Sequence, residues 1–265
     1  MKLSCLGSGK MGTALLQGIV SRGVCASGDI AISDPSAAAL AAAAAAVPGV
    51  VTAASNQEAA RGADVVLLCV KPAGIVPLIE SLRELPSALL ISIAAGVTLS
   101  SMEAAAGHHR VIRVMPNTPA LIGKGAAAYA PGSKATEADC HTAETLLGAV
   151  GIVTRVAEKL LDAVTGLSGS GPAYIYTIIE ALADGGVLEG LTKEQALVLA
   201  AQTVSGAAEM VLQTGLHPAL LRDQVTSPGG TTIAGLAKLE EKGLRSALIE
   251  AVRTASARAR EMGKS

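Results

Sequence analysis

The sequence has almost no aromatic residues and few charged ones. Among its 265 residues there is no Trp, no Phe and only three Tyr, and charged residues make up 16%. Platforms that stack nucleic-acid bases on aromatic rings, and aromatic cages for cations, are therefore nearly excluded. The 21 basic and 22 acidic residues leave a formal net charge of -1, which provides no basic stripe for a phosphate backbone or a membrane surface. We predict no nucleic-acid partner and no membrane partner.

Cysteines and targeting signals are also scarce. The four cysteines lie far apart, without CxxC pairing or His at metal spacing, so we expect reduced thiols and no metal site. The sequence begins directly with a short apolar run and lacks the pattern of a secretion signal. No apolar stretch reaches the roughly 18 residues of a membrane span without an interruption. These features predict a cytoplasmic protein.

Half of the residues are hydrophobic, and their spacing changes along the chain. Up to residue 155, short β-branched runs alternate with amphipathic stretches, which is typical of a parallel sheet with crossover helices. The predicted strands are Lys2–Leu6, Asp29–Ser33, Val50–Thr52, Asp64–Val70, Leu89–Ala94, Arg110–Met115, Ala126–Ala130 and Gly151–Thr154. Beyond residue 156, apolar residues recur at helical spacing. The predicted helices are Leu160–Leu167, Tyr174–Leu188, Lys193–Thr214, Thr232–Lys242 and Arg245–Met262.

This pattern predicts an α/β protein with two domains. Residues 1–156 are expected to form a Rossmann-like, doubly wound sheet, and residues 157–265 an all-helical domain for substrate binding and dimerisation. Thr192 and Gln195 form a capping-box pattern at the start of one helix, and Gly215 followed by Pro218 ends it. The helices between residues 174 and 214 are apolar nearly all round, so we predict that two copies pair through them.

A Gly-x-Gly-x-x-Gly motif, Gly7 to Gly12, directly follows the first predicted strand and precedes a helical run over Thr13–Val20. In this context Gly7 permits a tight turn, Gly9 lets the backbone approach a pyrophosphate, and Gly12 lets the helix pack on the strand. Free amides at the helix start favour the negative charge. The motif therefore predicts a dinucleotide site.

An acidic residue follows the second predicted strand, and two interpretations of it stay open. Asp34 lies about 20 residues beyond the glycine motif, where a carboxylate binds the adenosine ribose and repels a 2′-phosphate, which favours NADH. Ser33 and Ser36 would hydrogen-bond a phosphate instead if Asp34 turned away. Asp34, which precedes Pro35, also fits a cap of the next helix.

Further segments fall at predicted strand ends and in the helical domain. They are Val70–Pro72, Ala94–Gly96, Arg113–Pro119, Leu167–Tyr174 and Val225–Thr232. Together with the glycine loop, and in the same order over nearly the whole chain, they closely resemble the pyrroline-5-carboxylate reductase family. The segments SGSGPAY and SPGGTT are far more particular than a glycine loop, so they identify the chain as a member of this family.

The resemblance implies reduction of 1-pyrroline-5-carboxylate to proline by NADPH or NADH, in a homodimer that many relatives assemble further into decamers. Relatives that prefer NADPH often have Ser or Asn-Arg where this chain has Ser33-Asp34. The cofactor contacts that the resemblance implies are Gly7, Ser8, Gly9, Lys10, Met11, Gly12, Ser33 or Asp34, Asn56, Val70, Lys71, Ala94, Ala95 and Gln224. The substrate contacts that it implies are Glu158, Ser227, Gly229, Gly230, Thr231 and Thr232.

Local sequence leaves Glu158 and Lys71 with alternatives, and it adds Asn117 as a further cofactor-binding candidate. Glu158 at a helix start also fits a solvated residue that complements the helix dipole. Lys71 before Pro72 also fits an exposed strand end. Asn117, in Pro-Asn-Thr-Pro, is a candidate for orienting the nicotinamide amide or for a simple Asx turn.

The chemistry of a cyclic imine that carries a carboxylate fits the SPGGTT segment. Gly229 and Gly230 permit a turn whose amides point at one spot, and the helix that begins near Thr232 adds its positive end, so both favour a carboxylate. The same residues also fit a plain interhelical turn. Thr232 is the predicted catalytic residue because its hydroxyl can bond the imine nitrogen, and a protonated imine needs no strong general acid.

Two other functions fit parts of the pattern. A 3-hydroxyacid dehydrogenase of the same architecture needs a base, commonly a Lys on the first interdomain helix, and residues 170–184 contain no Lys or His. A protein that senses NAD(P) without turnover needs the glycine loop but no second anion site at Ser227–Thr232.

Overall fold

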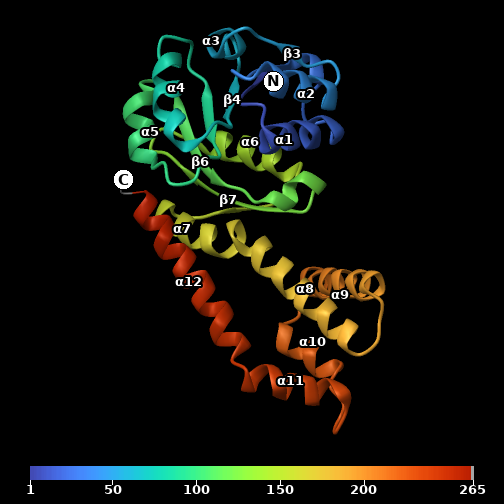
Figure 1. The fold of residues 1–265 in the computed structure, drawn as a ribbon. Helices are drawn as coiled ribbons and strands as arrows, with labels where there is room; N and C mark the ends of the chain where they lie inside the picture. Colours follow the sequence, from blue (N-terminus) through green and yellow to red (C-terminus); the bar gives the residue numbers. More distant parts are fainter. Residues whose placement is uncertain (264–265) are drawn as a thin grey trace. The chain divides into compact units, whose positions relative to one another are not determined.

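The computed structural model describes residues 1–263, which form two compact units. One unit comprises residues 1–170 together with the chain from residue 253 onward, and the other comprises residues 171–252. The predicted functional division after residue 156 stays a prediction, whereas the compact units divide after Ser170. Each unit is described separately below (Figure 1).

The first unit is built on one eight-stranded sheet with the strand order β3-β2-β1-β4-β5-β6-β7-β8. The strands are β1 (Leu3–Leu6), β2 (Ile30–Ser33), β3 (Val51–Thr52), β4 (Val65–Leu68), β5 (Leu89–Ser92), β6 (Arg110–Met115), β7 (Gly125–Pro131) and β8 (Gly151–Arg155). The first six run parallel. The order reverses between β1 and β4, and in such sheets ligands bind at this reversal, beyond the carboxyl ends of the strands.

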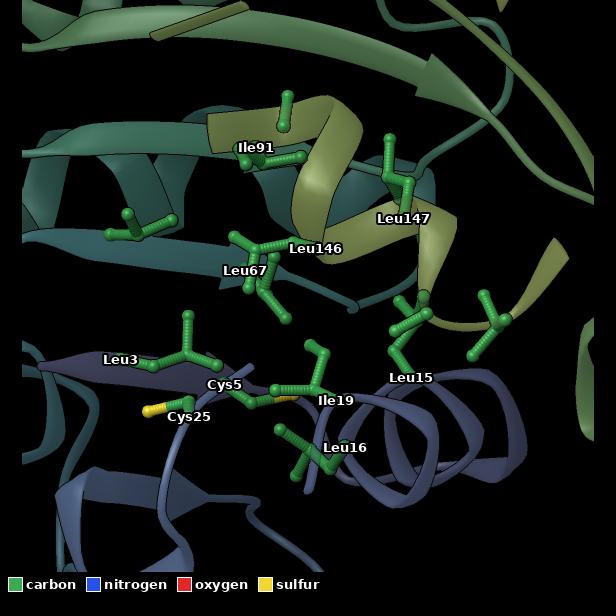
Figure 2. Packing of buried hydrophobic residues seen from close by; sticks show 14 of the residues in the cluster. Leu3, Cys5, Leu15, Leu16, Ile19, Cys25, Leu67, Ile91, Leu146 and Leu147 are labelled. Carbon is green, nitrogen blue, oxygen red and sulfur yellow. The ribbon is translucent and has the colours of Figure 1, made fainter. Parts of the chain in front are cut away.

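Alternation of side chains along the strands produces two apolar layers. Leu3 and Cys5 of β1 face one layer and Leu6 faces the other. The first layer packs against α1 (Lys10–Ser21), α2 (Ala37–Ala46) and α6 (Glu137–Gly148), as Figure 2 shows for Leu15, Leu16, Ile19, Leu146 and Leu147. The second packs against α3 (Asn56–Ala60), α4 (Ile75–Leu82) and α5 (Leu99–Ala106). The sheet is therefore wound on both faces, as predicted.

The structure corrects the predicted sheet in two details. Strand β7 runs antiparallel to β6, because the short segment 116–124 joins them without a full crossover helix. β4 and β5 end two residues earlier than predicted, at Leu68 and Ser92. The residues that follow these strands line the cleft described below.

The second unit is helical. It contains α8 (Gly171–Leu188), α9 (Lys193–Thr214), α10 (Pro218–Gln224), α11 (Thr231–Glu241) and the start of α12 (Leu244–Met262). The predicted capping box at α9 is present, since the Thr192 side chain accepts from the Gln195 amide and the Gln195 side chain accepts from the Thr192 amide. Gly215 ends α9 in the left-handed conformation, with φ of 65°.

Helix α10 is absent from the predicted elements. Pro218, interpreted from the sequence as the end of α9, occupies the first turn of α10, and Nδ1 of His217 accepts from the Ala219 amide at 3.2 Å. Proline is common in the first turn of a helix. Here Pro218 follows the end of α9 and also begins α10.

The contact between α8 and α9 is small-residue packing around Ala183, Ala196 and Ala200, which are buried. Outside this seam, large apolar side chains of the two helices are exposed in the single chain. They include Ile175, Tyr176, Leu182, Leu188, Leu197, Val198, Leu199 and Leu212. Such a surface is typical of a face that another protein chain covers.

A buried histidine joins α4, β5 and β6. His109 is 2% exposed; its Nδ1 accepts from the Ala88 amide at 3.1 Å, and its Nε2 lies 3.0 Å from the Leu82 carbonyl oxygen. This pairing fixes the neutral tautomer with the proton on Nε2. Burial, together with the charges of His108 and Arg110, lowers the pKa of His109 below its ordinary 6.5.

We therefore predict an acid-sensitive contribution of His109 to stability. The neutral ring is favoured in the folded chain, so its contribution is complete above pH 6.5 and decreases as the pH falls through the interval below it, where the unfolded chain binds a proton first. At pH 7.5, His109→Leu should lose about 1–3 kcal/mol of unfolding free energy, because the Ala88 amide loses its acceptor. The difference from wild type should shrink by pH 5.5 in urea unfolding.

His141→Leu serves as the control, because His141 is exposed on α6. That variant should stay close to wild type at both pH values. A difference between His109→Leu and wild type that is constant with pH would contradict the assignment of a neutral ring.

Candidate active site

A cleft of about 450 Å³ lies at the carboxyl ends of the central strands. Three of the loops that line it follow β1, β4 and β5, the strands on both sides of the reversal in strand order. Its lining residues are Gly7, Gly9, Asp34, Pro35, Cys69, Val70, Lys71, Pro72, Ile93, Ala94 and Ala95. The fold thus brings seven of the residues predicted to bind cofactor, from four separate loops, to one concave surface.

The glycine loop has the geometry that the motif predicts. Gly7 has φ of 96°, and a Cβ on it would lie 2.7 Å from the Cys69 carbonyl oxygen. A Cβ on Gly12 would lie 2.4 Å from the Gly7 carbonyl oxygen, whereas a Cβ on Gly9 would meet no atom within 4 Å. Gly7 and Gly12 therefore serve the packing of the loop, and Gly9 leaves open space beside the chain.

Two polar features of this loop fit an anionic dinucleotide. Helix α1 begins at Lys10 behind Gly9, and no described side chain caps it, so its first amides remain for an anion. The Ser8 hydroxyl is buried without a hydrogen-bond partner among the described residues. A buried polar group without a partner is costly unless a ligand or water satisfies it. Ser8 and Lys10 also line a second groove, against α2.

Asp34 connects the β2 end to the glycine loop. Its Oδ2 accepts from the Ser8 amide at 2.7 Å, and its Oδ1 accepts from the Ser36 amide at 2.8 Å. The cap of α2 is Ser36, whose hydroxyl accepts from the Ala39 amide, so Asp34 is not the cap residue. The capping interpretation of Asp34 is thus replaced by an Asx-type turn whose carboxylate lines the cleft.

Ser33 and Asn56 form a hydrogen-bonded pair beside Asp34. The buried Ser33 hydroxyl donates to Oδ1 of Asn56 at 2.6 Å. Asn56 is the first residue of α3, whose cap is Ser55. The pair joins the end of β2 to α3 and places the Asn56 side chain beside the carboxyl end of β2.

Asn117 holds two backbone segments together. Its Oδ1 accepts from the Ala126 amide at 2.8 Å, and its Nδ2 donates to the Ser168 carbonyl at 3.0 Å. Ser168 lies in a π-helical turn, Thr165–Gly169, inside the predicted SGSGPAY segment. Asn117 is buried, and both the oxygen and the nitrogen of its side-chain amide form hydrogen bonds with backbone groups. The alternative of a simple Asx turn predicted a structural role but not the bond to the distant Ser168. Its cofactor contact stays a prediction.

Glu158 takes part in a partly buried ion pair that the sequence did not predict. Its Oε1 accepts from Arg113 at 2.9 Å and from the Leu99 amide at 2.6 Å, and Arg113 is 7% exposed. Arg113 also lies 3.9 Å from Asp162. Both carboxylates thus compensate a charge inside β6. The signal in the sequence was an arginine within an otherwise apolar strand, since such a residue is rarely buried without a partner.

Cys69 is the one sulfur on the cleft surface, with Cys5 behind it at 3.8 Å. The hydrogen bond with Cys5 and burial raise the pKa of the Cys69 thiol well above its ordinary value. A thiol in that state is a poor nucleophile. The described residues contain no group of His, Cys, Asp and Glu that could hold a metal ion.

The remaining predicted residues lie in the helical unit, at the start of α11. The Gly230 amide donates to the Ser227 carbonyl at 3.1 Å, and Gly229 has φ of 66°, so Ser-Pro-Gly-Gly forms a tight turn of the kind that needs glycine at its third position. Gly230 precedes α11 without a side-chain cap among the described residues. Gln224 ends α10, just before this turn.

Helices α1 and α11 follow an extended glycine without a side-chain cap, whereas five helices follow a residue whose hydroxyl caps them. Helix α4 also follows a glycine, Gly74, but it continues a 3-10 turn over Pro72–Gly74. Ser36, Ser55, Thr98, Thr136 and Thr192 cap α2, α3, α5, α6 and α9 through their side chains. α1 and α11 begin after Gly9 and Gly230 instead. Both therefore present first-turn amides to whatever anion approaches them.

Comparisons with known proteins agree with this geometry. Residues 158–262 match the family described as pyrroline-5-carboxylate reductase dimerisation, and residues 2–96 match the family described as NADP oxidoreductase coenzyme F420-dependent. A pyrroline-5-carboxylate reductase of Methanosarcina acetivorans is 47% identical over 99% of this chain and 98% of its own.

Two solved structures resemble the whole chain. A pyrroline-5-carboxylate reductase of Coxiella burnetii superposes with a TM-score of 0.94 at 37% identity, covering 100% of this chain and 99% of the other. A pyrroline carboxylate reductase of Plasmodium falciparum with NADP bound gives a TM-score of 0.87 at 33% identity, covering 99% and 98%.

The glycine loop generates a paired prediction. Gly9→Ala should leave the melting temperature unchanged, because its Cβ enters open space, yet weaken dinucleotide binding at least about tenfold by blocking the approach of the pyrophosphate. Gly12→Ala should instead cost about 1–3 kcal/mol of stability, because its Cβ overlaps the Gly7 carbonyl. Thermal unfolding and fluorescence titration with dinucleotide measure both effects.

Gly28→Ala is the matched control, because Gly28 lies away from the cleft and its Cβ would also meet nothing within 4 Å. Gly28→Ala should change neither the melting temperature nor the affinity for dinucleotide. Wild-type dinucleotide affinity in Gly9→Ala would show that the pyrophosphate does not lie at this loop.

Proposed function

Since the chain belongs to the pyrroline-5-carboxylate reductase family, we propose that it reduces the C=N bond of 1-pyrroline-5-carboxylate to give L-proline. The observation that carries the proposal is the identity of 47% over essentially the whole of both chains. NAD(P)H supplies the hydride, and the protonated imine becomes a neutral secondary amine. The two alternative functions are a hydroxyacid dehydrogenase and an NAD(P) sensor.

The front unit is proposed to bind the dinucleotide. The first-turn amides of α1 and the Ser8 hydroxyl face the pyrophosphate, and Gly9 leaves room for it. The loops after β4 and β5 form the opposite wall of the cleft. Their proposed contacts are Val70, Lys71, Ala94 and Ala95. Lys10, Met11, Ser33, Asn56, Asn117 and Gln224 complete the proposed set.

The helical unit is proposed to bind the substrate carboxylate at the start of α11. The Gly230 amide already donates to the Ser227 carbonyl, so the proposed binding groups are the first-turn amides of α11. This uncapped start adds the positive end of an 11-residue helix. Thr231 and Thr232 contribute first-turn amides and hydroxyls. Glu158 stays a proposed substrate contact as well, with a carboxylate whose position Arg113 and the Leu99 amide fix.

Thr232 is proposed to orient the imine nitrogen through its hydroxyl. Hydride arrival at the ring carbon neutralises the charged nitrogen, so no side chain has to deliver a proton in the same step. Positioning therefore supplies most of the rate, and a hydroxyl is sufficient because it donates or accepts as the charge on nitrogen changes.

A homodimer through the C-terminal helices is proposed as the working assembly, with a decamer as its larger form and the cytoplasm as its location. Among residues 1–263, α9 is long and apolar enough for a membrane span by length and composition alone. We propose that a second copy of the chain covers the apolar surface of α9, because α9 lies inside the matched dimerisation segment.

Reduction of a ketone or oxidation of a hydroxyacid is less compatible with these residues. Hydroxyacid oxidation needs a base near the substrate, and α8 contains neither Lys nor His. A sensor without turnover needs no glycine-capped second anion site such as α11.

We predict turnover of pyrroline-5-carboxylate with oxidation of NAD(P)H, followed as loss of absorbance of the reduced nicotinamide. Thr232→Ala should lower kcat/KM ten- to a few hundredfold, roughly 1.4–3.5 kcal/mol, because the imine nitrogen loses its partner. Thr232→Ser should keep most of the activity because it retains the hydroxyl.

Thr226→Ala is the control for this experiment. The Thr226 hydroxyl donates to the Arg222 carbonyl inside α10, so its loss should leave kinetics near wild type. Turnover only with hydroxyacids would support a dehydrogenase, and dinucleotide binding without turnover would support a sensor. Unchanged kinetics in Thr232→Ala would remove Thr232 from the mechanism.

A charge placed on the apolar face should break the dimer. Val198 on α9 is 64% exposed in the single chain, so Val198→Glu leaves the fold of each copy intact but places a carboxylate in the proposed interface. Light scattering should then show a smaller mass than wild type at micromolar concentration. Ala45→Glu, at an exposed position of α2, should keep the wild-type mass.

A further inference from the structure

The turn between β2 and α2 lies where proteins with this fold distinguish NADH from NADPH. NADH has a free 2′-hydroxyl on its adenosine ribose, which donates a hydrogen bond. NADPH has a phosphate there, which carries a charge close to -2 and only accepts. In doubly wound sheets this ribose lies beside the end of the second strand. Residues 33–36 form that turn in this chain.

Asp34 lines the cleft, and two hydrogen bonds fix its carboxylate. Both of its oxygens accept from backbone amides, Oδ2 from Ser8 at 2.7 Å and Oδ1 from Ser36 at 2.8 Å. Hydrogen bonds to an ionised acceptor are among the strong ones, and turning the side chain away would break both. The sequence alone left open whether Asp34 turns away to admit a phosphate, and these two bonds oppose such a movement.

Few hydrogen-bond donors remain for a phosphate on this turn. The amides of Ser8 and Ser36 already donate to Asp34, and the Ser33 hydroxyl donates to Asn56. The donors that remain are neutral: the Ser36 hydroxyl, the Asn56 side-chain amide and the first backbone amides of α2. A carboxylate oxygen accepts more than one hydrogen bond, so Asp34 retains acceptor capacity for ribose hydroxyls.

Neither of the two nearby lysines, Lys71 and Lys10, belongs to the turn itself. Lys71 follows β4, which is two strand spacings from β2 in the sheet, roughly 10 Å. Lys10 lines an adjoining groove, which shares Gly9 with the cleft and lies against Ala39 and Ala42 of α2. The turn from Ser33 to Ser36 itself contains one charged residue, and it is negative.

We propose that Asp34 makes this chain selective for NADH over NADPH. Its carboxylate accepts from the ribose hydroxyls and repels the 2′-phosphate, while the Ser8 amide holds it in place. This inference rests on the proposed function and specifies its cosubstrate. It sets this chain apart from the Plasmodium falciparum relative, which contains NADP.

The test compares both dinucleotides in binding and in turnover. Wild type should bind NADH more tightly than NADPH and show a kcat/KM for NADH that is higher by about tenfold or more. Asp34→Ser should shift that ratio toward NADPH by about tenfold or more. Raising the salt concentration should weaken the discrimination in wild type but not in Asp34→Ser, because salt screens the repulsion between carboxylate and phosphate.

Two further variants keep the result interpretable. Asp34→Asn removes the charge with little change in shape, and it replaces Asp34→Ser if that variant does not fold. Asp29→Asn removes an exposed carboxylate just before the opposite end of β2 and should leave the ratio unchanged.

Each outcome decides the question. A wild-type preference for NADPH, or a ratio that neither Asp34 variant changes, would overturn the inference while turnover still supports the proposed function. Binding of neither dinucleotide would contradict the proposed function and this inference together.

Discussion

The close contact between the first turn of the chain and the backbone that follows β4 is the constraint on which the site depends. Gly7 lies against the Cys69 carbonyl, and Gly12 lies against the Gly7 carbonyl, at distances that exclude any side chain. This packing brings the start of α1 over the reversal in strand order. The amides of α1, the Asp34 carboxylate and the loops after β4 and β5 then share one cleft.

A second theme is how helix starts are satisfied. Five helices begin with a Ser or Thr whose side chain accepts from one first-turn amide, which satisfies part of the helix start within the protein. α1 and α11 begin with glycine and leave those donors to a ligand. The extended glycine caps of α1 and α11 coincide with the two anion sites proposed above.

Much of the fold could be predicted because the hydrophobic spacing changes so clearly. Every strand was located to within about two residues, and α9 to its observed ends, because a capping box and a left-handed glycine bound it. The antiparallel direction of β7 was missed, because strand direction depends on the connection and not on the strand's own residues. α10 was missed because Pro218 was assigned only one of its two roles.

The sequence predicts which residues form the candidate site but not which hydrogen bonds and ion pairs they make. The glycine loop carries its geometry in its spacing, so its conformation follows from the sequence. Asp34, Asn117 and Glu158 instead take their partners from residues distant in the chain, namely Ser8, Ser168 and Arg113. Those contacts arise from the order of the strands, which local patterns do not specify.

The borders of the sheet have a consequence for how copies of the chain meet. β3 at one border is two residues long, and β8 at the other ends in Arg155, which pairs with Glu137. Short or charged borders offer little unpaired backbone for a strand from a neighbouring molecule. Both borders of the sheet therefore resist extension by a strand from a second molecule, so pairing of copies has to use surfaces other than the sheet edges.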